Sequence, residues 1–230
     1  MIPLRDDNPS FRPQIVTVTF IVTCVLVWLW QLSFGEQGGQ RIVYALGVVP
    51  ASLLGQQQLP PELSLVAPWM TVFTSMFMHG GWMHLIGNML YLWVFGDNVE
   101  DSMGHGRFVV FYLLCGAAAV FAQALPEPSS MIPMVGASGA ISGVLGAYLL
   151  LYPHARVLVA VPLGFILHTM RIPAGFVLVL WFGLQLLSSA MAQPGQGGVA
   201  FRAHIGGFIA GMILIPLFKQ RQARLRLPWG

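Results

Sequence analysis

Charged residues are scarce in this sequence of 230 amino acids. Asp, Glu, Lys and Arg together make up 8% of it, whereas hydrophobic residues make up 56%. Because soluble domains carry about 25% charged residues, this composition excludes an ordinary soluble domain and predicts an integral membrane protein. The net charge of +3 then matters less than the positions of the individual positive residues.

Cysteine is also scarce, and several familiar patterns are missing. Cys24 and Cys115 each lie in the middle of an apolar run, which indicates core residues and excludes a disulfide framework. His79 and His84 are five residues apart with no Glu after the first, so the His-Glu-x-x-His pattern of zinc proteases is absent. Internal repeats, which transporters usually show, are absent too. We therefore expect no metal and no cofactor.

The apolar runs define one membrane domain at residues 14–218, between a polar N-terminal segment (1–13) and a basic tail (219–230). The first run is too long for a signal-peptide core and no cleavage pattern follows it, so we expect it to remain as a helix. The predicted spans cover residues of about 14–34, 80–100, 107–125, 137–152, 173–192 and 199–218.

Two further segments contain many apolar residues but are predicted to lie at the membrane surface. Residues 35–78 are interrupted by four prolines and carry little charge, which is typical of an interfacial segment. Residues 153–172 hold Arg156, Arg171 and Pro162, which argue against a seventh span. The expected fold is therefore an all-α polytopic bundle of six transmembrane helices.

The positive residues predict the orientation of this bundle. With the N-terminus inside, nine of the eleven Lys and Arg residues fall on the cytoplasmic side, and Arg41 and Arg202 fall outside. Since Lys and Arg concentrate in cytoplasmic loops, both termini are predicted to be cytoplasmic. A seventh span through residues 155–172 would move the basic tail outside, and the positive residues would then no longer concentrate on the cytoplasmic side.

The fourth span is short and begins with the small residues Gly-Ala-Ser-Gly at positions 136–139. From Ser138 to Tyr152 it has 15 residues. A helix of that length covers roughly 22 Å, whereas a hydrocarbon core needs about 30 Å. Ser138 is therefore expected inside the bilayer, at a helix N-terminus with unpaired N–H groups. Gly207 and Gly211 in the sixth span form a small-xxx-small pair that lets the two helices approach closely.

Three more polar residues are predicted at the depth of Ser138: His84 and Asn88 in the second span, and His204 in the sixth. His204 lies 15 residues before the cytoplasmic end of its span, as Ser138 does. Ionisable groups inside a span are costly and mark candidate functional sites. Ser138 by itself would more simply be a helix-packing residue, but four polar groups in one layer favour catalysis.

This set of residues suits nucleophilic catalysis. A neutral histidine can accept the proton of a serine hydroxyl, so His204 is the candidate general base for Ser138. His84 and Asn88 share one helix face, and together with backbone N–H groups at the start of the fourth helix they can donate hydrogen bonds to an oxyanion. No Asp or Glu lies at this depth, so we expect a Ser–His dyad.

These motifs resemble those of the rhomboid intramembrane serine proteases. That family shows Gly-x-Ser-Gly opening a short fourth helix, a histidine followed by glycines in the sixth, and His-x-x-x-Asn in the second; here they are residues 136–139, 203–207 and 84–88. The resemblance implies a six-helix rhomboid bundle that cleaves transmembrane segments of other membrane proteins. It further implies a multi-pass protein of a bacterial inner membrane, with its active site opening to the extracytoplasmic side.

By this resemblance Ser138 is the nucleophile and His204 the general base. The implied oxyanion hole consists of His84, Asn88 and the backbone N–H groups of Ala137 and Ser138. Some family members carry an aromatic residue four positions after the serine, stacked on the histidine, where this chain has Ser142.

Substrate and water need separate routes to such a site. We predict that water enters from outside, beneath a mobile cap at residues 193–198 that includes Gly197 and Gly198. The substrate helix is predicted to enter between the second and fifth spans, past Trp181 and Phe182. Expected partners are transmembrane protein substrates and the lipid bilayer, with no nucleic acid, and the oligomeric state is left open. The alternative function is a proteolytically inactive rhomboid-like binding or chaperone module.

Overall fold

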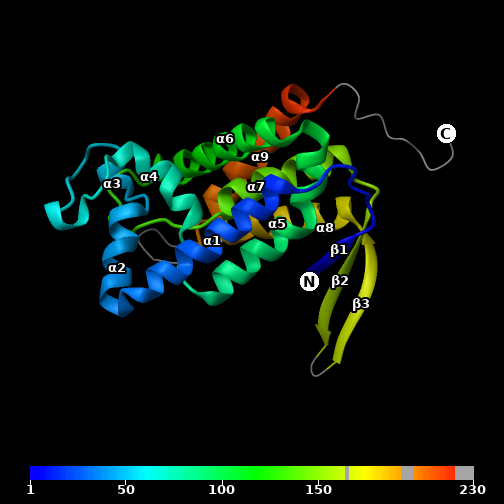
Figure 1. The fold of residues 1–230 in the computed structure, drawn as a ribbon, viewed down its shortest axis with the longest axis horizontal. Coiled ribbons are helices and arrows are strands. Elements are labelled where there is room, and N and C mark those ends of the chain that lie inside the picture. Colours follow the sequence, from blue (N-terminus) through cyan, green and yellow to red (C-terminus); the bar gives the residue numbers. More distant parts are fainter. Residues whose placement is uncertain (164–165, 193–198, 221–230) are drawn as a thin grey trace.

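The computed structural model describes residues 1–163, 166–192 and 199–220 (Figure 1). Its helices are α1 (Ile15–Ser33), α2 (Gly35–Leu46), α3 (Pro50–Leu53), α4 (Pro68–Thr74), α5 (Trp82–Met103), α6 (His105–Ala124), α7 (Ser138–Leu151), α8 (Ala174–Met191) and α9 (Phe201–Phe218). Two 3-10 turns, η1 (Pro61–Leu63) and η2 (Ser75–Phe77), and three strands, β1 (Ile2–Asp6), β2 (Arg156–Leu163) and β3 (Ile166–Pro173), complete the described elements.

All six segments predicted as spans are helical. Helices α1, α6, α8 and α9 are long and apolar enough to cross a membrane. Helix α7 is apolar but has only 14 residues, and α5 has 22 residues but carries Asp97, Glu100 and Asp101 near its C-terminal end. The structure is therefore mostly helical with four candidate membrane spans, and the count of six crossings stays a prediction.

Helix α7 lies at the centre of the bundle. Residues 139–148 are all buried, and the helix packs most extensively against α9, followed by α6 and α5. A Cβ atom added to Gly207 would lie 2.0 Å from the carbonyl oxygen of Gly139, and one added to Gly211 would lie 1.9 Å from that of Gly143. Side chains larger than hydrogen are excluded at both positions, so the predicted close approach of these two helices is confirmed.

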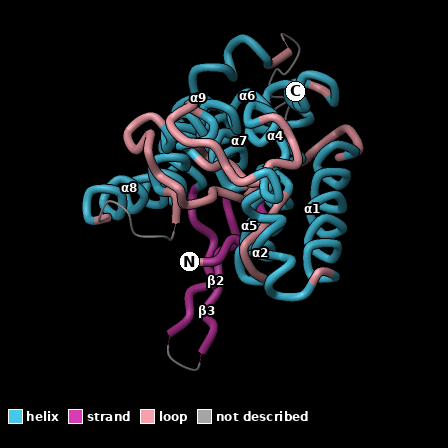
Figure 2. The backbone as a smooth tube through the Cα atoms, turned by 90° about the vertical axis from the view of Figure 1, so that its left-hand side faces the viewer, coloured by secondary structure: helices cyan, strands magenta, loops and turns pink. Residues whose placement is uncertain are grey.

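The strands form an antiparallel sheet in the order β1-β2-β3, which projects from one end of the helices (Figure 2). In β2, Val157 and Val159 are fully buried, and in the register Val157 pairs with Asp6 of β1 and Ile172 of β3. The expectation of an all-α fold is therefore wrong for residues 2–6, 156–163 and 166–173. Alternating β-branched residues favour a strand in this region, and the N-terminal segment supplies the third strand.

The connection between α1 and α5 lies at the opposite end of the bundle from the sheet (Figure 1). Pro50, Pro61 and Pro68 each occupy the first turn of a short helix, where the missing N–H of proline costs nothing. The connection is tied to α1 by Gln31, whose side-chain amide donates to the carbonyl of His79 at 3.1 Å and accepts from its N–H at 3.2 Å. This segment is thereby held rigidly beside the start of α5.

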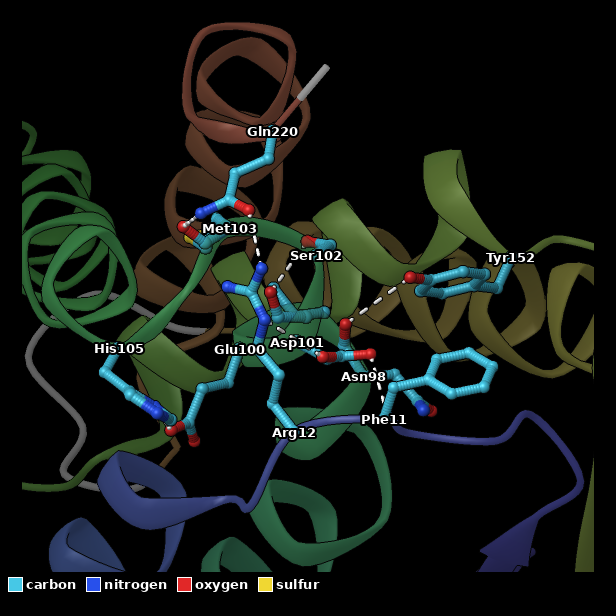
Figure 3. A network of polar contacts seen from close by, with 11 residues as sticks. Phe11, Arg12, Asn98, Glu100, Asp101, Ser102, Met103, His105, Tyr152 and Gln220 are labelled. Carbon is cyan, nitrogen blue, oxygen red and sulfur yellow. Dashed lines mark hydrogen bonds and ion pairs between the residues drawn. The ribbon is translucent and has the colours of Figure 1, made fainter. Parts of the chain in front are cut away.

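A polar network at the sheet end joins several helix ends (Figure 3). Glu100 of α5 is 1% exposed, and its carboxylate accepts hydrogen bonds from the N–H groups of Val16 and Thr17 at 2.9 and 2.8 Å. Because these N–H groups at the start of α1 have no partner within the helix, Glu100 caps α1 from a neighbouring helix. The same carboxylate lies 2.6 Å from the Nδ1 atom of His105 at the start of α6.

The same network brings the N-terminal segment to the end of α9. Arg12 donates to the side chain of Gln220 at 2.9 Å, and the N–H of Gln220 donates to the carbonyl of Ser102 at 2.9 Å. The backbone N–H of Phe11 donates to Asp101 at 3.1 Å. The segment before α1 and Gln220, two residues after α9, thus lie at one end of the bundle (Figure 3).

Candidate active site

Ser138 is the first residue of α7, and the turn before it determines where its hydroxyl lies. Gly136 has a φ of +129°, a conformation that favours glycine, and its N–H donates to the carbonyl of Ser75 at 2.9 Å. Ala137 precedes the helix and is fully buried. Since the first N–H groups of a helix find no partner within it, the start of α7 offers free donors and the positive end of the helix dipole.

His204 of α9 contacts the Ser138 side chain directly. Its Nε2 atom lies 2.8 Å from the Oγ atom of Ser138, within hydrogen-bonding distance. His204 is 9% exposed, and the close glycine contact between α7 and α9 holds the two backbones near each other. The structure thus brings together the serine and the histidine that sequence reasoning had paired.

The other ring nitrogen of His204 has a partner that sequence reasoning missed. Its Nδ1 atom lies 2.8 Å from the Oε1 atom of Gln185 in α8. The ring of Trp181, one turn earlier in the same helix, lies 5.9 Å from the His204 ring at an interplanar angle of 36°. Gln185 is the one polar side chain in the apolar stretch 174–187, and that isolation was the signal that could have found it.

Ser142 lies one turn after Ser138 in α7. Its hydroxyl donates to the carbonyl of Ser138 at 2.6 Å, so it bonds within α7. The aromatic ring beside His204 comes from Trp181 of α8 instead. The His204 ring is therefore held by two side chains of α8, Gln185 and Trp181.

His84 and Asn88 approach Ser138 from α5. The Nδ1 atom of His84 accepts a long hydrogen bond, 3.4 Å, from the N–H of Gly80, which leaves Nε2 of a neutral ring as the donor. A Cβ atom added to Gly136 would lie 2.7 Å from this Nε2 and 3.6 Å from the Oγ of Ser138. Asn88 is 8% exposed, and its Nδ2 has no hydrogen-bond partner among the described residues. His84 and Asn88 therefore offer two donors, and both residues line the same cavity as Ser138.

A cavity of about 720 Å³ joins these groups. It is lined by residues that include Ser138, His204, His84, Asn88, Gln185 and Trp181. Phe182, the other predicted gate residue, stacks on Phe208 with ring centroids 4.5 Å apart. The predicted cap residues Gly197 and Gly198 lie outside the described residues. The cavity thus contains a hydroxyl and a base, from Ser138 and His204, and two hydrogen-bond donors, from His84 and Asn88. These groups are sufficient for acyl transfer.

Comparison with known proteins shows the family to which this chain belongs. The sequence matches the Rhomboid domain family over residues 67–221. Rhomboid protein 1, mitochondrial, of Saccharomyces cerevisiae is 29% identical over 207 residues, which make up 81% of this chain and 57% of that protein. Rhomboid protease GluP of Bacillus subtilis is 30% identical over 208 residues, 90% of this chain and 34% of that protein.

The apolar helices and these matches define an integral, multi-pass membrane protein. The chain belongs to the rhomboid family. It spans 57% of the length of the yeast relative and 34% of the length of GluP. The family resemblance drawn from the sequence motifs is thus confirmed.

Proposed function

We propose that this protein is an intramembrane serine endopeptidase that hydrolyses peptide bonds in or near transmembrane segments of other membrane proteins. The observation that carries the proposal is the 2.8 Å contact between the Oγ of Ser138 and the Nε2 of His204. A serine hydroxyl becomes a competent nucleophile when a neighbouring base accepts its proton. Family membership supports the same reading, because GluP is named a rhomboid protease.

The reaction follows from the positions of these groups. Oγ of Ser138 attacks the scissile carbonyl carbon while Nε2 of His204 takes the hydroxyl proton. The oxyanion that forms is stabilised by the Nε2–H of His84, the Nδ2–H of Asn88 and the N–H groups of Ala137 and Ser138. The tetrahedral intermediate then collapses: the C–N bond breaks and His204 gives its proton to the leaving amine. His204 then takes a proton from water, which attacks the acyl-enzyme carbonyl; the bond between the acyl carbon and Oγ breaks, and His204 returns the proton to Oγ of Ser138.

We infer that the protein crosses the membrane six times, with both termini cytoplasmic and the site opening to the extracytoplasmic side of a bacterial inner membrane. An even number of crossings is supported by the contacts that join Phe11 and Arg12 to the ends of α5 and α9. The orientation is supported by the nine of eleven Lys and Arg residues on the proposed inner side. The three acidic residues of α5 lie near that same inner end, where Glu100 is buried and bonded to the start of α1.

The substrate is proposed to enter sideways between α5 and α8, past Trp181 and Phe182, and to unwind locally. A helix hides its carbonyl groups in hydrogen bonds, so substrates with helix-breaking residues near the cut are preferred. Trp181 lines the cavity, whereas Phe182 supports the wall by packing on Phe208. The small residues at 136–139 leave room for a small side chain before the scissile bond.

The direct test is cleavage of a transmembrane substrate by purified protein in detergent. Ser138→Ala is expected to lower kcat by about 1,000-fold or more, because the nucleophile is lost, while the thermal unfolding midpoint stays close to that of the wild type. Ser189→Ala, in α8, is the matched control and should cleave normally. Equal cleavage by Ser138→Ala and wild type would contradict the proposal. Substrate binding without cleavage by the wild type would leave the inactive binding module as the function.

A further inference from the structure

We propose that Gln185 is a positioning residue, which holds His204 in the tautomer that can accept the proton of Ser138. This inference rests on the proposed proteolytic function. It starts from two distances to one ring: Oε1 of Gln185 lies 2.8 Å from Nδ1 of His204, and Oγ of Ser138 lies 2.8 Å from Nε2. Both nitrogens of the imidazole are therefore engaged, one by each neighbour.

The chemistry of the partners decides which nitrogen carries the proton. The Oε1 atom of an amide can only accept a hydrogen bond, so Nδ1 of His204 must be the protonated nitrogen. In a neutral ring Nε2 then holds the free lone pair, directed at the Ser138 hydroxyl. The opposite tautomer would place N–H against the serine and leave two lone pairs facing each other at Nδ1. Gln185 therefore selects the one neutral form that can act as the base.

An uncharged acceptor suits this position better than a carboxylate. The described structure places Gln185 on α8, one of the four long apolar helices, where an ionised side chain would be costly to bury. Fixing a tautomer needs an acceptor lone pair, not a charge. The amide supplies that lone pair without the desolvation cost of a carboxylate.

The same helix holds the ring by a second contact. Trp181 lies one turn before Gln185 and its indole ring faces His204 at 5.9 Å. Helix α8 packs mainly against α9, the helix that carries His204. Trp181 and Gln185 therefore contact the base from a helix that packs directly beside it. Trp181 restricts the tilt of the ring and Gln185 fixes its rotation about the Cβ–Cγ bond, since a flipped ring would lose the Nδ1 hydrogen bond.

Two substitutions of similar size separate this role from simple packing. Gln185→Leu removes the acceptor, and Gln185→Glu retains one. The leucine variant is expected to lose about tenfold in kcat, the effect of one hydrogen bond on the barrier, with KM within about twofold of the wild type. The glutamate variant should recover most of that loss at pH 8. Leu187→Ala, on the lipid-exposed side of the same helix, is the control and should cleave at the wild-type rate.

A spectroscopic readout makes the test independent of turnover. In protein labelled with 15N-histidine, the His204 resonances are assigned by their loss in His204→Ala. The wild type and Gln185→Glu should show a protonated Nδ1 and an unprotonated Nε2, whereas Gln185→Leu should show a mixture of tautomers. This measurement also decides the matter if the leucine variant is too unstable for kinetics, because the glutamate variant must then still show the single tautomer.

The outcomes distinguish the two proposals. If Ser138→Ala abolishes cleavage but Gln185→Leu retains the wild-type kcat and a single His204 tautomer, the positioning role is overturned and the protease function stands. If Gln185→Glu is as impaired as Gln185→Leu, an acceptor oxygen at this position does not restore the base, and the role is again overturned. If wild-type protein and Ser138→Ala behave alike with every transmembrane substrate, the protease function itself is wrong.

Discussion

Asp6 shows at the scale of a single residue how the sheet and the helices are coupled. It lies in β1, and its carboxylate accepts a hydrogen bond from the hydroxyl of Tyr148 in α7. Burial raises the pKa of Asp6 to about 6, the nearby charges of Asp97 and Asp7 act in the same direction, and the Tyr148 hydrogen bond opposes them. The ionised form of Asp6 is therefore less stable in the folded protein than in water.

This environment predicts a pH-dependent stability. Because the folded protein retains the Asp6 proton up to about pH 6, whereas an ordinary Asp releases it near 3.8, this group is expected to lower the free energy of unfolding as the pH rises through that window. Asp6→Asn removes the effect and is expected to stabilise the protein at pH 7.5 by about 1 kcal/mol, after allowance for partial exposure. Thermal unfolding in detergent at pH 4.5 and 7.5 measures it. A variant whose midpoint follows the wild type at both pH values would contradict the account.

The residues of the candidate site differ in how far the sequence could predict them. Ser138 and His204 could be paired because polar groups inside apolar helices are rare and their depths can be counted along each helix. Gln185 carries the same signal, since it is the one polar side chain in the apolar stretch 174–187, but an uncharged amide does not by itself indicate which residue it contacts. Which nitrogen of His204 faces the serine depends on that contact, so sequence alone could not predict it.

At the scale of elements, the contact between α7 and α9 determines whether the site exists. The two helices approach through Gly139, Gly143, Gly207 and Gly211, where any Cβ would overlap a carbonyl oxygen or a neighbouring side chain. Ser138 and His204 lie at the same end of this contact. Any side chain that separates the two helices must therefore also lengthen the hydrogen bond between hydroxyl and imidazole.

Gly207→Ala tests this dependence. The new Cβ would lie 2.0 Å from the carbonyl oxygen of Gly139, and the forced displacement is expected to cost about 1–3 kcal/mol of stability and more than about tenfold in kcat. Gly106→Ala in α6 is the matched control, because a Cβ there would meet nothing within 4 Å. Unfolding midpoints and cleavage rates are measured together. Normal cleavage by Gly207→Ala would show that the helix contact does not position the dyad.

The elements themselves were predictable to different degrees. The six apolar segments could be recognised because a helix in lipid needs a continuous apolar run. Residues 153–172 were predicted only as a connection at the membrane surface, and the strands β2 and β3 in this region were not predicted. The pairing of β2 with residues 2–6 involves partners about 150 positions apart in the sequence, and such contacts are not visible in local periodicity.

At the scale of the whole molecule, the proposed gate between α5 and α8 separates substrate entry from water entry. Met83 in α5 and Met191 in α8 are 81% and 74% exposed, and the native cysteines Cys24 and Cys115 are fully buried. Cysteines introduced at the two methionines should therefore react selectively, and bifunctional maleimides of different lengths are used to bridge them.

A short bridge is expected to abolish cleavage of a transmembrane substrate, because the two helices can no longer separate. A long bridge between the same cysteines is the control and should leave cleavage within about twofold of the reduced protein. Labelling of Ser138 by a small water-soluble reagent should be unaffected by either bridge. Undiminished cleavage with a fully formed short bridge would show that the substrate enters elsewhere.

His204 is proposed to make the Ser138 hydroxyl a nucleophile inside the membrane. Treating membranes that contain the protein with a fluorophosphonate probe, and mapping the modified residue by mass spectrometry, measures this reactivity without a substrate. We expect one modified serine, Ser138, and a labelling rate that falls by about 100-fold or more in His204→Ala. Labelling of a different serine, or of Ser138 at the same rate without the histidine, would contradict this proposal.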